Sequence, residues 1–438
     1  MFRPPFRAPS RRSLLAAGTA AALTAAGTAA TSAPAVAAGP SRGTGRGPTV
    51  LSGADVAAAE DWSLLRGRRV GVVSNPTGVL RDTTHVVDSL AARSELDVVG
   101  VFGPEHGFRG SAQAGESEGE YTDPRTGLTV YDAYGAGAAE LAEMFTRAGA
   151  DTLVFDIQDV GVRYYTYIWT MYDAMVAART VGARFVVLDR PNPIGRRVDG
   201  PLLEPEFASG VGAQPIVQQH GMTVGELARY FNGELLPRQE PGGQVELEVV
   251  PVRHWDPASS ADTGLPWVPP SPNMPTVDTA RVYAGTGYFE GTNLSEGRGT
   301  TRPFELVGAP YLDYRFADRL NARELPGVRF REAYFVPTFG KHEGVDCAGV
   351  QLHVTDPGRY QPIPTAVAML VEARRYADFA WREDDWDAER PFWIDKLSGS
   401  PRLRTMIDAG ADAPEVCAAW EREVRAFERA RRPYLLYR

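Results

Sequence analysis

Residues 96–110 read LDVVGVFGPEHGFRG, an apolar run that ends in a charged pair between glycines. The apolar part, residues 96–101, predicts a buried strand. Glu105 and His106 follow where the chain leaves that strand and turns. Because ligands of open α/β sheets bind at the carboxyl ends of the strands, Glu105 is the first candidate for a working carboxylate. The alternative is a turn whose Glu105 and His106 face water.

Segments typical of strands and helices alternate around this stretch. We expect strands at residues 69–74, 96–102, 128–131, 151–157, 184–188 and 245–252, with helices at 82–90, 140–148, 170–180 and 223–232. Continuous Val, Ile, Leu and Phe runs separated by helices predict an α/β domain with a parallel sheet covered on both faces, which we place at residues 61–276. A proline-rich crossing at 256–276 ends it.

A second, smaller α+β domain is expected at residues 277–438. The regular alternation of strands and helices stops here. We expect two extended runs, at 328–337 and 349–356, and then mainly helices, at 363–378 and 413–432.

The first 37 residues predict an export signal rather than part of the fold. Residues 10–15, SRRSLL, are a twin-arginine start, and residues 35–37, AVA, are a small-residue cleavage site. An ordinary export signal is the alternative. Residues 38–60 are expected to be a leader or linker, and the mature protein is expected to be secreted or extracytoplasmic.

The charge of the chain excludes some classes of partner. The net charge is −9, and the signal carries four arginines and no acid, so the remainder is more acidic still. Nucleic acids and anionic membranes need clustered positive charge, so neither is expected as a partner. The apolar stretch of the signal is short, so no stable membrane insertion is expected after its removal.

Polar clusters follow four of the predicted strands, at residues 74–78, 105–106, 156–165 and 189–193. The carboxyl ends of parallel strands share one edge of a sheet, so we expect these clusters to form a polar cleft. They supply the candidate site residues Asn75, His106, Asp156, Asp159, Arg163, Tyr164 and Asn192. For Asp156 and Asp189 the alternative is a helix cap or a buried partner of Arg163 or Arg190.

The second domain offers a loop at residues 290–303, EGTNLSEGRGTTRP, which is too rich in glycine to be a helix. Its candidates are Glu290, Asn293, Glu296, Arg298 and Arg302. The planar guanidinium of arginine pairs with carboxylates, so the loop suits a hydroxyl-rich, partly anionic ligand. An exposed loop of paired charges is the alternative. The turn at residues 339–344, FGKHEG, is expected to face solvent.

Several kinds of chemistry are not indicated. The six histidines show no metal-ligand spacing, so neither a metal nor another cofactor is expected. Residues 115–119, GESEG, match the nucleophile-elbow pattern but lack the strand and helix that it requires. Cys347 and Cys417 could form a disulfide in an oxidising compartment, and the sequence leaves that open.

Six motifs, taken in order, resemble the bacterial exo-β-N-acetylmuramidase family of glycoside hydrolases. They lie at residues 74–78 (SNPTG), 103–107 (GPEHG), 156–161 (DIQDVG), 189–193 (DRPNP), 219–222 (QHGM) and 290–293 (EGTN). The resemblance covers residues 65–438. It implies a Rossmann-like domain with a smaller auxiliary domain, an active site between them, and release of terminal N-acetylmuramic acid from peptidoglycan fragments. It also implies that Glu105 is the leading catalytic candidate.

Glycosidic cleavage usually needs an acid for the leaving oxygen and a second group for the oxocarbenium-like centre. We expect Glu105 to be the general acid/base. The second group stays open among Asp156, Asp159, Glu290, Glu296 and the substrate's own acetamido oxygen. Arg163, Arg298 and Arg302 are the candidates for the lactyl carboxylate of muramyl sugars. The competing hypotheses are an exported glycan-binding protein without activity and an amidase or esterase.

Overall fold

The structure is a computed structural model that describes residues 49–113, 115–239, 242–258 and 263–437. The predicted export signal at residues 1–37 and the leader up to residue 48 lie outside these residues. Among the described residues, no helix is both long and apolar enough to cross a membrane. Cys347 and Cys417 are both free, which answers the question that the sequence left open.

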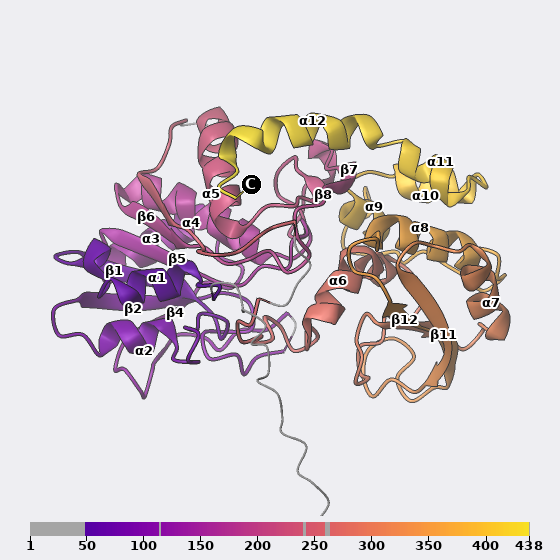
Figure 1. Cartoon of the computed structure of the whole chain (residues 1–438), viewed down its shortest axis with the longest axis horizontal. Coiled ribbons are helices and arrows are strands. Elements are labelled where there is room, and N and C mark those ends of the chain that lie inside the picture. The colour runs from indigo at the N-terminus through magenta and orange to yellow at the C-terminus, as the bar shows by residue number, and fades with distance from the viewer. Residues whose placement is uncertain (1–48, 114, 240–241, 259–262, 438) are drawn as a thin grey trace, which may run out of the picture. The chain divides into compact units, whose positions relative to one another are not determined.

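The first lobe is built on a seven-stranded sheet (Figure 1). Its order is β3-β4-β2-β1-β5-β6-β9, and every neighbouring pair is parallel except β3 with β4. The strands are β1 (Arg69–Ser74), β2 (Asp97–Gly103), β3 (Tyr121–Thr122), β4 (Thr129–Asp132), β5 (Thr152–Asp156), β6 (Arg184–Leu188) and β9 (Leu247–Val250). Numbered along the chain, the six parallel strands have the order 3-2-1-4-5-6, which is the doubly wound Rossmann arrangement.

Alternate residues of the central strands enter two separate cores, so both faces of the sheet are covered. In β5, Val154 belongs to one core while Leu153 and Phe155 belong to the other. The core that contains Val154 includes residues of α1 (Gly53–Ala59) and α2 (Val86–Ala91). The core that contains Leu153 and Phe155 includes residues of α3 (Ala138–Ala148), α4 (Tyr167–Val181) and α5 (Val224–Tyr230). The α/β prediction and the Rossmann-like expectation are therefore confirmed.

One boundary needs correction, because residues 53–59 of the expected linker form helix α1. The helix starts in a capping box, in which the Ser52 and Asp55 side chains each accept from the other's backbone N–H. Gly53 lies against the sheet, where an added Cβ would be 2.3 Å from the Val250 carbonyl oxygen and 2.4 Å from the Asp189 nitrogen. This close approach of helix to strand requires glycine and makes α1 part of the first lobe.

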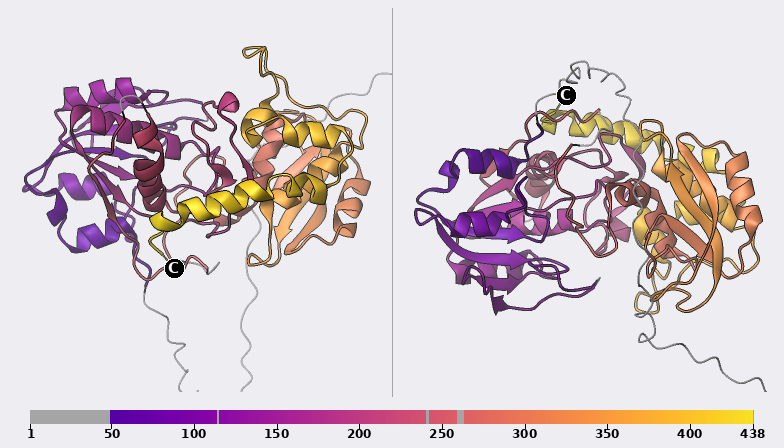
Figure 2. Two further views of the ribbon diagram at one scale, coloured as in Figure 1. Left: turned by 90° about the horizontal axis from the view of Figure 1, so that it is seen from above. Right: turned by 60° about the horizontal axis from the view of Figure 1, so that its bottom comes forward.

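The second lobe contains a three-stranded antiparallel sheet, β10-β12-β11, with helices around it (Figure 2). Its strands are β10 (Leu306–Ala309), β11 (Val328–Phe335) and β12 (Cys347–Val354), and its helices are α6 (Val277–Thr286), α7 (Tyr314–Ala322), α8 (Pro362–Ala373), α9 (Trp393–Ser398), α10 (Arg402–Asp408), α11 (Ala413–Ala418) and α12 (Glu421–Arg431). A short ladder, β7 (Asp199–Leu202) with β8 (Val217–Gln219), lies between the two sheets in sequence. Short helical turns complete the chain: η1 (Ser63–Leu65), η2 (Pro205–Phe207), η3 (Phe231–Leu235), η4 (Leu236–Arg238), η5 (Gly287–Gly291) and η6 (Arg432–Tyr434).

The C-terminal segment returns to the first lobe. The single helix expected at 413–432 is two helices, α11 and α12, which meet at the buried Trp420. After α12 the chain reaches the edge of the parallel sheet, where the Tyr437 hydroxyl donates to Asp189 at 2.5 Å and the Leu436 N–H donates to Glu226 at 2.8 Å. Residues from the end of the chain therefore help to fix the first lobe.

Candidate active site

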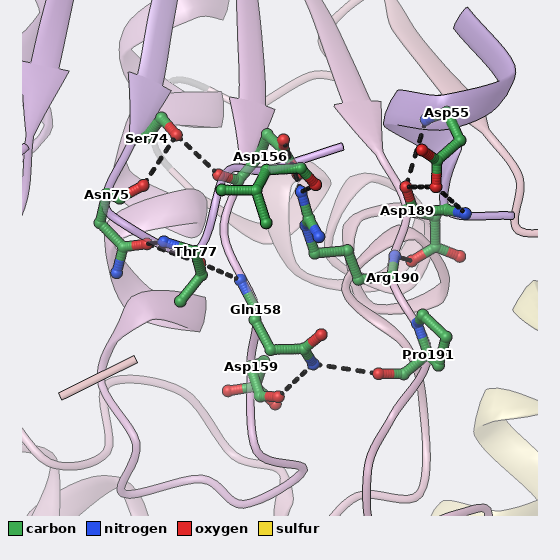
Figure 3. Close-up of polar contacts among 12 residues, drawn as sticks. Asp55, Ser74, Asn75, Thr77, Asp156, Gln158, Asp159, Asp189, Arg190 and Pro191 are labelled. Carbon is green, nitrogen blue, oxygen red and sulfur yellow. Dashed lines mark hydrogen bonds and ion pairs between the residues drawn. The ribbon is translucent and has the colours of Figure 1, made fainter. Parts of the chain in front are cut away.

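The polar residues that end the parallel strands bond mainly to one another (Figure 3). The Ser74 hydroxyl donates to the Asp156 carbonyl oxygen at 2.9 Å, which ties β1 to β5. The Asn75 Oδ1 accepts from the Thr77 hydroxyl at 2.6 Å, and the Thr77 hydroxyl in turn accepts from the Gln158 N–H at 2.8 Å. Asn75 therefore shapes the turn after β1, and the structure does not place it among the residues that line the Glu105 hollow described below.

Asp156, predicted as a catalytic group, forms a buried ion pair with Arg190. Its two carboxylate oxygens accept from Arg190 at 2.6 and 2.8 Å, and Asp156 is 0% exposed. With both oxygens engaged and no exposed surface, this carboxylate cannot reach a sugar. The structure thus favours the buried-partner alternative for Asp156.

Asp159 and Asn192 also stabilise the sheet edge. Asp159 Oδ2 accepts from the Gly161 N–H at 2.6 Å and lies 3.3 Å from the Nε2 of the buried His220. The Asn192 amide bridges Met222 and Ile194, accepting from the Ile194 N–H at 3.0 Å and donating to the Met222 carbonyl at 3.0 Å. Neither residue lines the Glu105 hollow, so the structure does not bring them beside Glu105.

Glu105 lies in the loop that follows β2, and His106 holds that loop in shape. His106 has a φ of 71°, in the left-handed region that few non-glycine residues adopt. Its Nδ1 lies 3.2 Å from the Ala112 carbonyl oxygen and 3.1 Å from that of Gln113, so the imidazole closes the loop from inside. As a result the Glu105 Oε1 accepts the Gly115 N–H at 2.9 Å. The Oε2 has one weak contact, 3.4 Å to the Thr166 hydroxyl.

Both lobes contribute to a hollow of about 140 Å³ around Glu105. The first lobe supplies Glu105, His106 and residues 164–167, and the second supplies Tyr283, Glu290 and Arg298. Ser271, from the proline-rich crossing, and Val211 complete the lining. Glu105, His106, Tyr164, Glu290 and Arg298 are therefore the sequence candidates that the fold brings together.

Tyrosines form much of this hollow and stay protonated. Burial raises the pKa of Tyr164, Tyr165 and Tyr283 well above its usual value, so their hydroxyls are donors rather than phenolates. The Tyr164 hydroxyl bonds to the carbonyl oxygens of Tyr283 and Ala284 at 2.8 and 2.9 Å. These bonds join the end of α6 to the segment that precedes α4 and fix one wall of the hollow.

A second hollow of about 640 Å³ adjoins the first, and the two share Glu290 and Arg298. Arg298 lies between two carboxylates, 2.8 Å from Glu290 and 3.3 Å from Glu296. Burial opposes the charge on Arg298, but the two carboxylates outweigh burial and raise its pKa. Glu296 lines the larger hollow, so the structure brings this candidate beside the site without placing it against Glu105.

Lys341 belongs to the same cluster, although residues 339, 340, 343 and 344 of its turn are exposed, as expected. Its ammonium donates to the carbonyl oxygens of Phe289 and Leu294 at 2.7 and 3.0 Å and lies 3.0 Å from Glu296 Oε2. The chain has two lysines among 46 lysine and arginine residues, and the other, Lys396, is fully buried. An ammonium group has three N–H donors, so Lys341 can serve both carbonyl oxygens and Glu296.

The remaining candidates have other roles. Arg163 is fully buried and donates to the carbonyl oxygens of Pro201, Ile216 and Leu397, and burial lowers its pKa to about 10. Arg302 is 3.4 Å from Glu305. The Asn293 side-chain amide donates to the Asp378 carbonyl oxygen and accepts from the Tyr311 hydroxyl and the Ala380 N–H. None of Arg163, Asn293 and Arg302 lines either hollow, so the structure does not bring them beside Glu105.

Sequence patterns gave little signal for several lining residues. Tyr283 lies within α6, a helix that the sequence analysis did not predict, and Ser271 comes from the proline-rich crossing. Within the described ranges, no group of three or more His, Cys, Asp or Glu side chains could hold a metal ion. The site therefore offers carboxylates, a guanidinium, an ammonium and neutral hydroxyls, a set suited to acid–base chemistry on a hydroxyl-rich ligand.

Known proteins resemble this chain along most of its length. Residues 70–278 match the family described as "Exo-beta-N-acetylmuramidase NamZ, N-terminal", and residues 281–437 match its C-terminal counterpart. The peptidoglycan beta-N-acetylmuramidase NamZ of Bacillus subtilis (strain 168) is 43% identical over 397 residues, which cover 90% of this chain and 93% of the relative. Crystal structures of two DUF1343 family proteins from Bacteroides fragilis share the fold, with TM-scores of 0.77 and 0.71 at 32% and 31% identity, each covering 89% of this chain and 99% of its own.

Proposed function

The chain belongs to the exo-β-N-acetylmuramidase NamZ family of glycoside hydrolases, and we propose that it releases terminal N-acetylmuramic acid from peptidoglycan fragments. The observation that carries this proposal is the Glu105 carboxylate in a small hollow to which both lobes contribute. The adjoining hollow of about 640 Å³ shares Glu290 and Arg298 with it, so a terminal sugar can be accommodated beside Glu105, which supports exo action.

We assign Glu105 the role of general acid/base. Its Oε1 is held by the Gly115 N–H, while Oε2 has only the 3.4 Å contact with Thr166, so Oε2 is the oxygen available to carry the proton. Protonation of the bridging oxygen by this group would let the leaving sugar depart as a neutral alcohol. The same carboxylate, once ionised, would take a proton from the incoming water.

The second group comes from the pair Glu290 and Glu296. Glu290 lines the same hollow as Glu105, and Arg298 and Lys341 offset the negative charge of the pair. A carboxylate at this position would stabilise the positive charge that develops on the sugar ring, or orient the substrate's acetamido group. Asp156 is less suited to the role, because both of its carboxylate oxygens accept from Arg190, and Asp159 does not line the Glu105 hollow.

Arg298 is the arginine that we assign to the lactyl carboxylate. Of the three arginines considered from sequence, Arg298 lines the hollow, whereas Arg163 and Arg302 do not. Its Nε faces Glu296 and one terminal nitrogen faces Glu290, which leaves Nη1 without a partner among the described residues. A ligand carboxylate could therefore bind Arg298 without breaking either ion pair.

We also propose that the protein acts outside the cytoplasm. The twin-arginine sequence at residues 10–15 and the cleavage pattern at 35–37 support this location, where peptidoglycan is found. A binding protein without activity is the less favoured reading, because the Bacillus subtilis relative is a muramidase. Release of free sugar from a chromogenic muramide would separate the two.

The test is the turnover of a chromogenic muramide by wild type and Glu105→Gln. Loss of the transferable proton should lower turnover by about 10²-fold or more, with an unchanged urea midpoint. Glu95→Gln is the matched control, because Glu95 is an exposed glutamate that precedes β2 at the opposite edge of the sheet. Near-normal turnover by Glu105→Gln would exclude Glu105 from the chemistry.

A further inference from the structure

Two more hollows adjoin each other beside the turn that follows β6. One has a volume of about 500 Å³ and the other about 360 Å³, and both are lined by Pro193 and Arg281. Neither includes Glu105 or the cluster around Arg298. We call the two together the Arg–Trp trough, after the side chains that distinguish its two halves.

The larger half is lined by four arginines from three separate parts of the chain. Arg196 and Arg197 come from the turn after β6, Arg281 from α6 and Arg431 from the last turn of α12. Arg431 is fixed in place, since one terminal nitrogen donates to the carbonyl oxygens of His220 and Gly221 and the other to that of Arg196 at 3.0 Å. These hydrogen bonds therefore hold Arg431 beside the other arginines, although their positive charges repel one another.

The positive charge of this half is only partly offset. Asp278 pairs with Arg281 at 2.5 Å, and Glu428 is the acid on the lining. The side chains of Arg196 and Arg197 make no hydrogen bond or ion pair with any residue that the structure describes. In a chain whose net charge is −9, two unpaired guanidinium groups at the wall of a hollow indicate a site for an anion.

The smaller half has a different chemistry. Trp255 and Trp267 line it, together with polar groups that include Gln158 and Asn192. The Trp267 indole N–H donates to the Met274 carbonyl oxygen at 3.2 Å, which fixes the ring. Indole rings beside hydrogen-bonding groups suit a sugar ring, which has apolar C–H faces and polar edges.

We propose that the Arg–Trp trough binds a carboxylate-bearing glycan strand, with sugar rings on the tryptophans and carboxylates on Arg196 and Arg197. This rests on the proposed function, because the muramyl residues of peptidoglycan supply such carboxylates. The proline-rich segment at residues 263–276 lines the trough and also contributes Ser271 and Asn273 to the two hollows of the active site. The trough would thus give the enzyme a second contact with its polymeric substrate, which a disaccharide does not use.

The experiment measures binding to wild-type protein by calorimetry with two tetrasaccharides. One alternates N-acetylglucosamine and N-acetylmuramic acid and has N-acetylglucosamine at its non-reducing end, so an exo-muramidase cannot cleave it. The other is chitotetraose, which has similar rings but no carboxylate. Wild type should prefer the acidic strand, and Arg196→Ala/Arg197→Ala should lose roughly tenfold in affinity for that strand alone.

Matched variants separate binding from structure and from net charge. Arg66→Ala/Arg68→Ala removes the same charge from two exposed arginines just before β1, at the opposite edge of the sheet, and should keep the preference. Trp255→Ala should weaken both tetrasaccharides alike. If the Arg196/Arg197 double variant has a lowered urea midpoint, Arg196→Gln and Arg197→Gln, which keep much of the side-chain length, replace it.

Three outcomes would contradict the proposed glycan binding. Wild type could bind both tetrasaccharides equally, or the arginine variant could lose the same affinity for both. Inorganic phosphate could also bind tightly and exclude the acidic strand. The last would mean a phosphate site. Turnover of a small chromogenic muramide should stay unchanged in the arginine variant. If wild type fails to release sugar from that substrate, the proposed function is wrong, whatever the tetrasaccharides show.

Discussion

Replacing Asp156 by asparagine should destabilise the protein rather than impair its chemistry. Asp156 is 0% exposed and Arg190 is 6% exposed, and two hydrogen bonds of 2.6 and 2.8 Å join them. Arg190 also donates to the Val79 carbonyl oxygen at 3.0 Å, which does not offset its charge. In Asp156→Asn the guanidinium would therefore stay buried without a counter-ion.

The loss of stability in Asp156→Asn is determined by the buried charge of Arg190, which then has no counter-ion. Removing one partner of a buried ion pair typically lowers the free energy of unfolding by about 3–5 kcal/mol. Removing both, as in Asp156→Leu/Arg190→Met, leaves no buried charge and should cost about 2 kcal/mol less than the two single variants together. The bond from Ser74 to the Asp156 carbonyl involves backbone and survives both changes.

The assay combines urea unfolding, followed by tryptophan fluorescence, with turnover per folded molecule. For Asp156→Asn we expect a lower urea midpoint and a turnover within about threefold of wild type wherever the protein is folded. Asp173→Asn, which changes a partly buried aspartate in the first lobe, controls for the loss of a carboxylate without an ion pair.

An unchanged urea midpoint combined with a turnover lowered by about 10²-fold would refute this reasoning. That result would return Asp156 to the catalytic role that the sequence had suggested. It would also require the Arg190 side chain to find another partner.

Three further predictions concern the site and the pH dependence of stability. Arg298→Gln should abolish the preference for muramyl over N-acetylglucosaminyl substrates, measured as the ratio of their kcat/KM values. An unchanged ratio would show that Arg298 does not bind the lactyl carboxylate. Lys341→Met should lower kcat by about tenfold or more, because the Phe289 and Leu294 carbonyls lose their donor, while a change in urea midpoint without a change in kcat would mean a purely structural role. Burial raises the pKa of Asp173 from 3.8 to about 6, so the folded protein keeps a proton that the unfolded chain has lost, and the penalty grows as pH rises from about 4 to 6. Asp173→Asn should therefore raise the free energy of unfolding by about 1–2 kcal/mol at pH 7 and by nothing near pH 3.5, as urea titrations at the two pH values would check.

The sequence by itself determined the parallel sheet and the position of Glu105. Short apolar runs such as residues 153–155, repeated between helical segments, predict strands that are covered on both sides. Once the sheet is parallel, the end of β2 must lie at the same edge as the ends of its neighbours. The placement of Glu105 thus follows from local pattern and one topological rule.

Tertiary structure alone decided which polar side chains at that edge face a ligand. Asp156 and Glu105 both follow buried strands, yet Arg190 arrives from β6 to neutralise one of them, while the other is left beside Arg298 and Tyr283 from the second lobe. Lys341 reaches its carbonyls from more than 40 residues along the chain. Hydrophobic periodicity records how deeply a residue is buried, but the partner of a buried charge depends on segments distant in sequence, and only the folded chain brings those together.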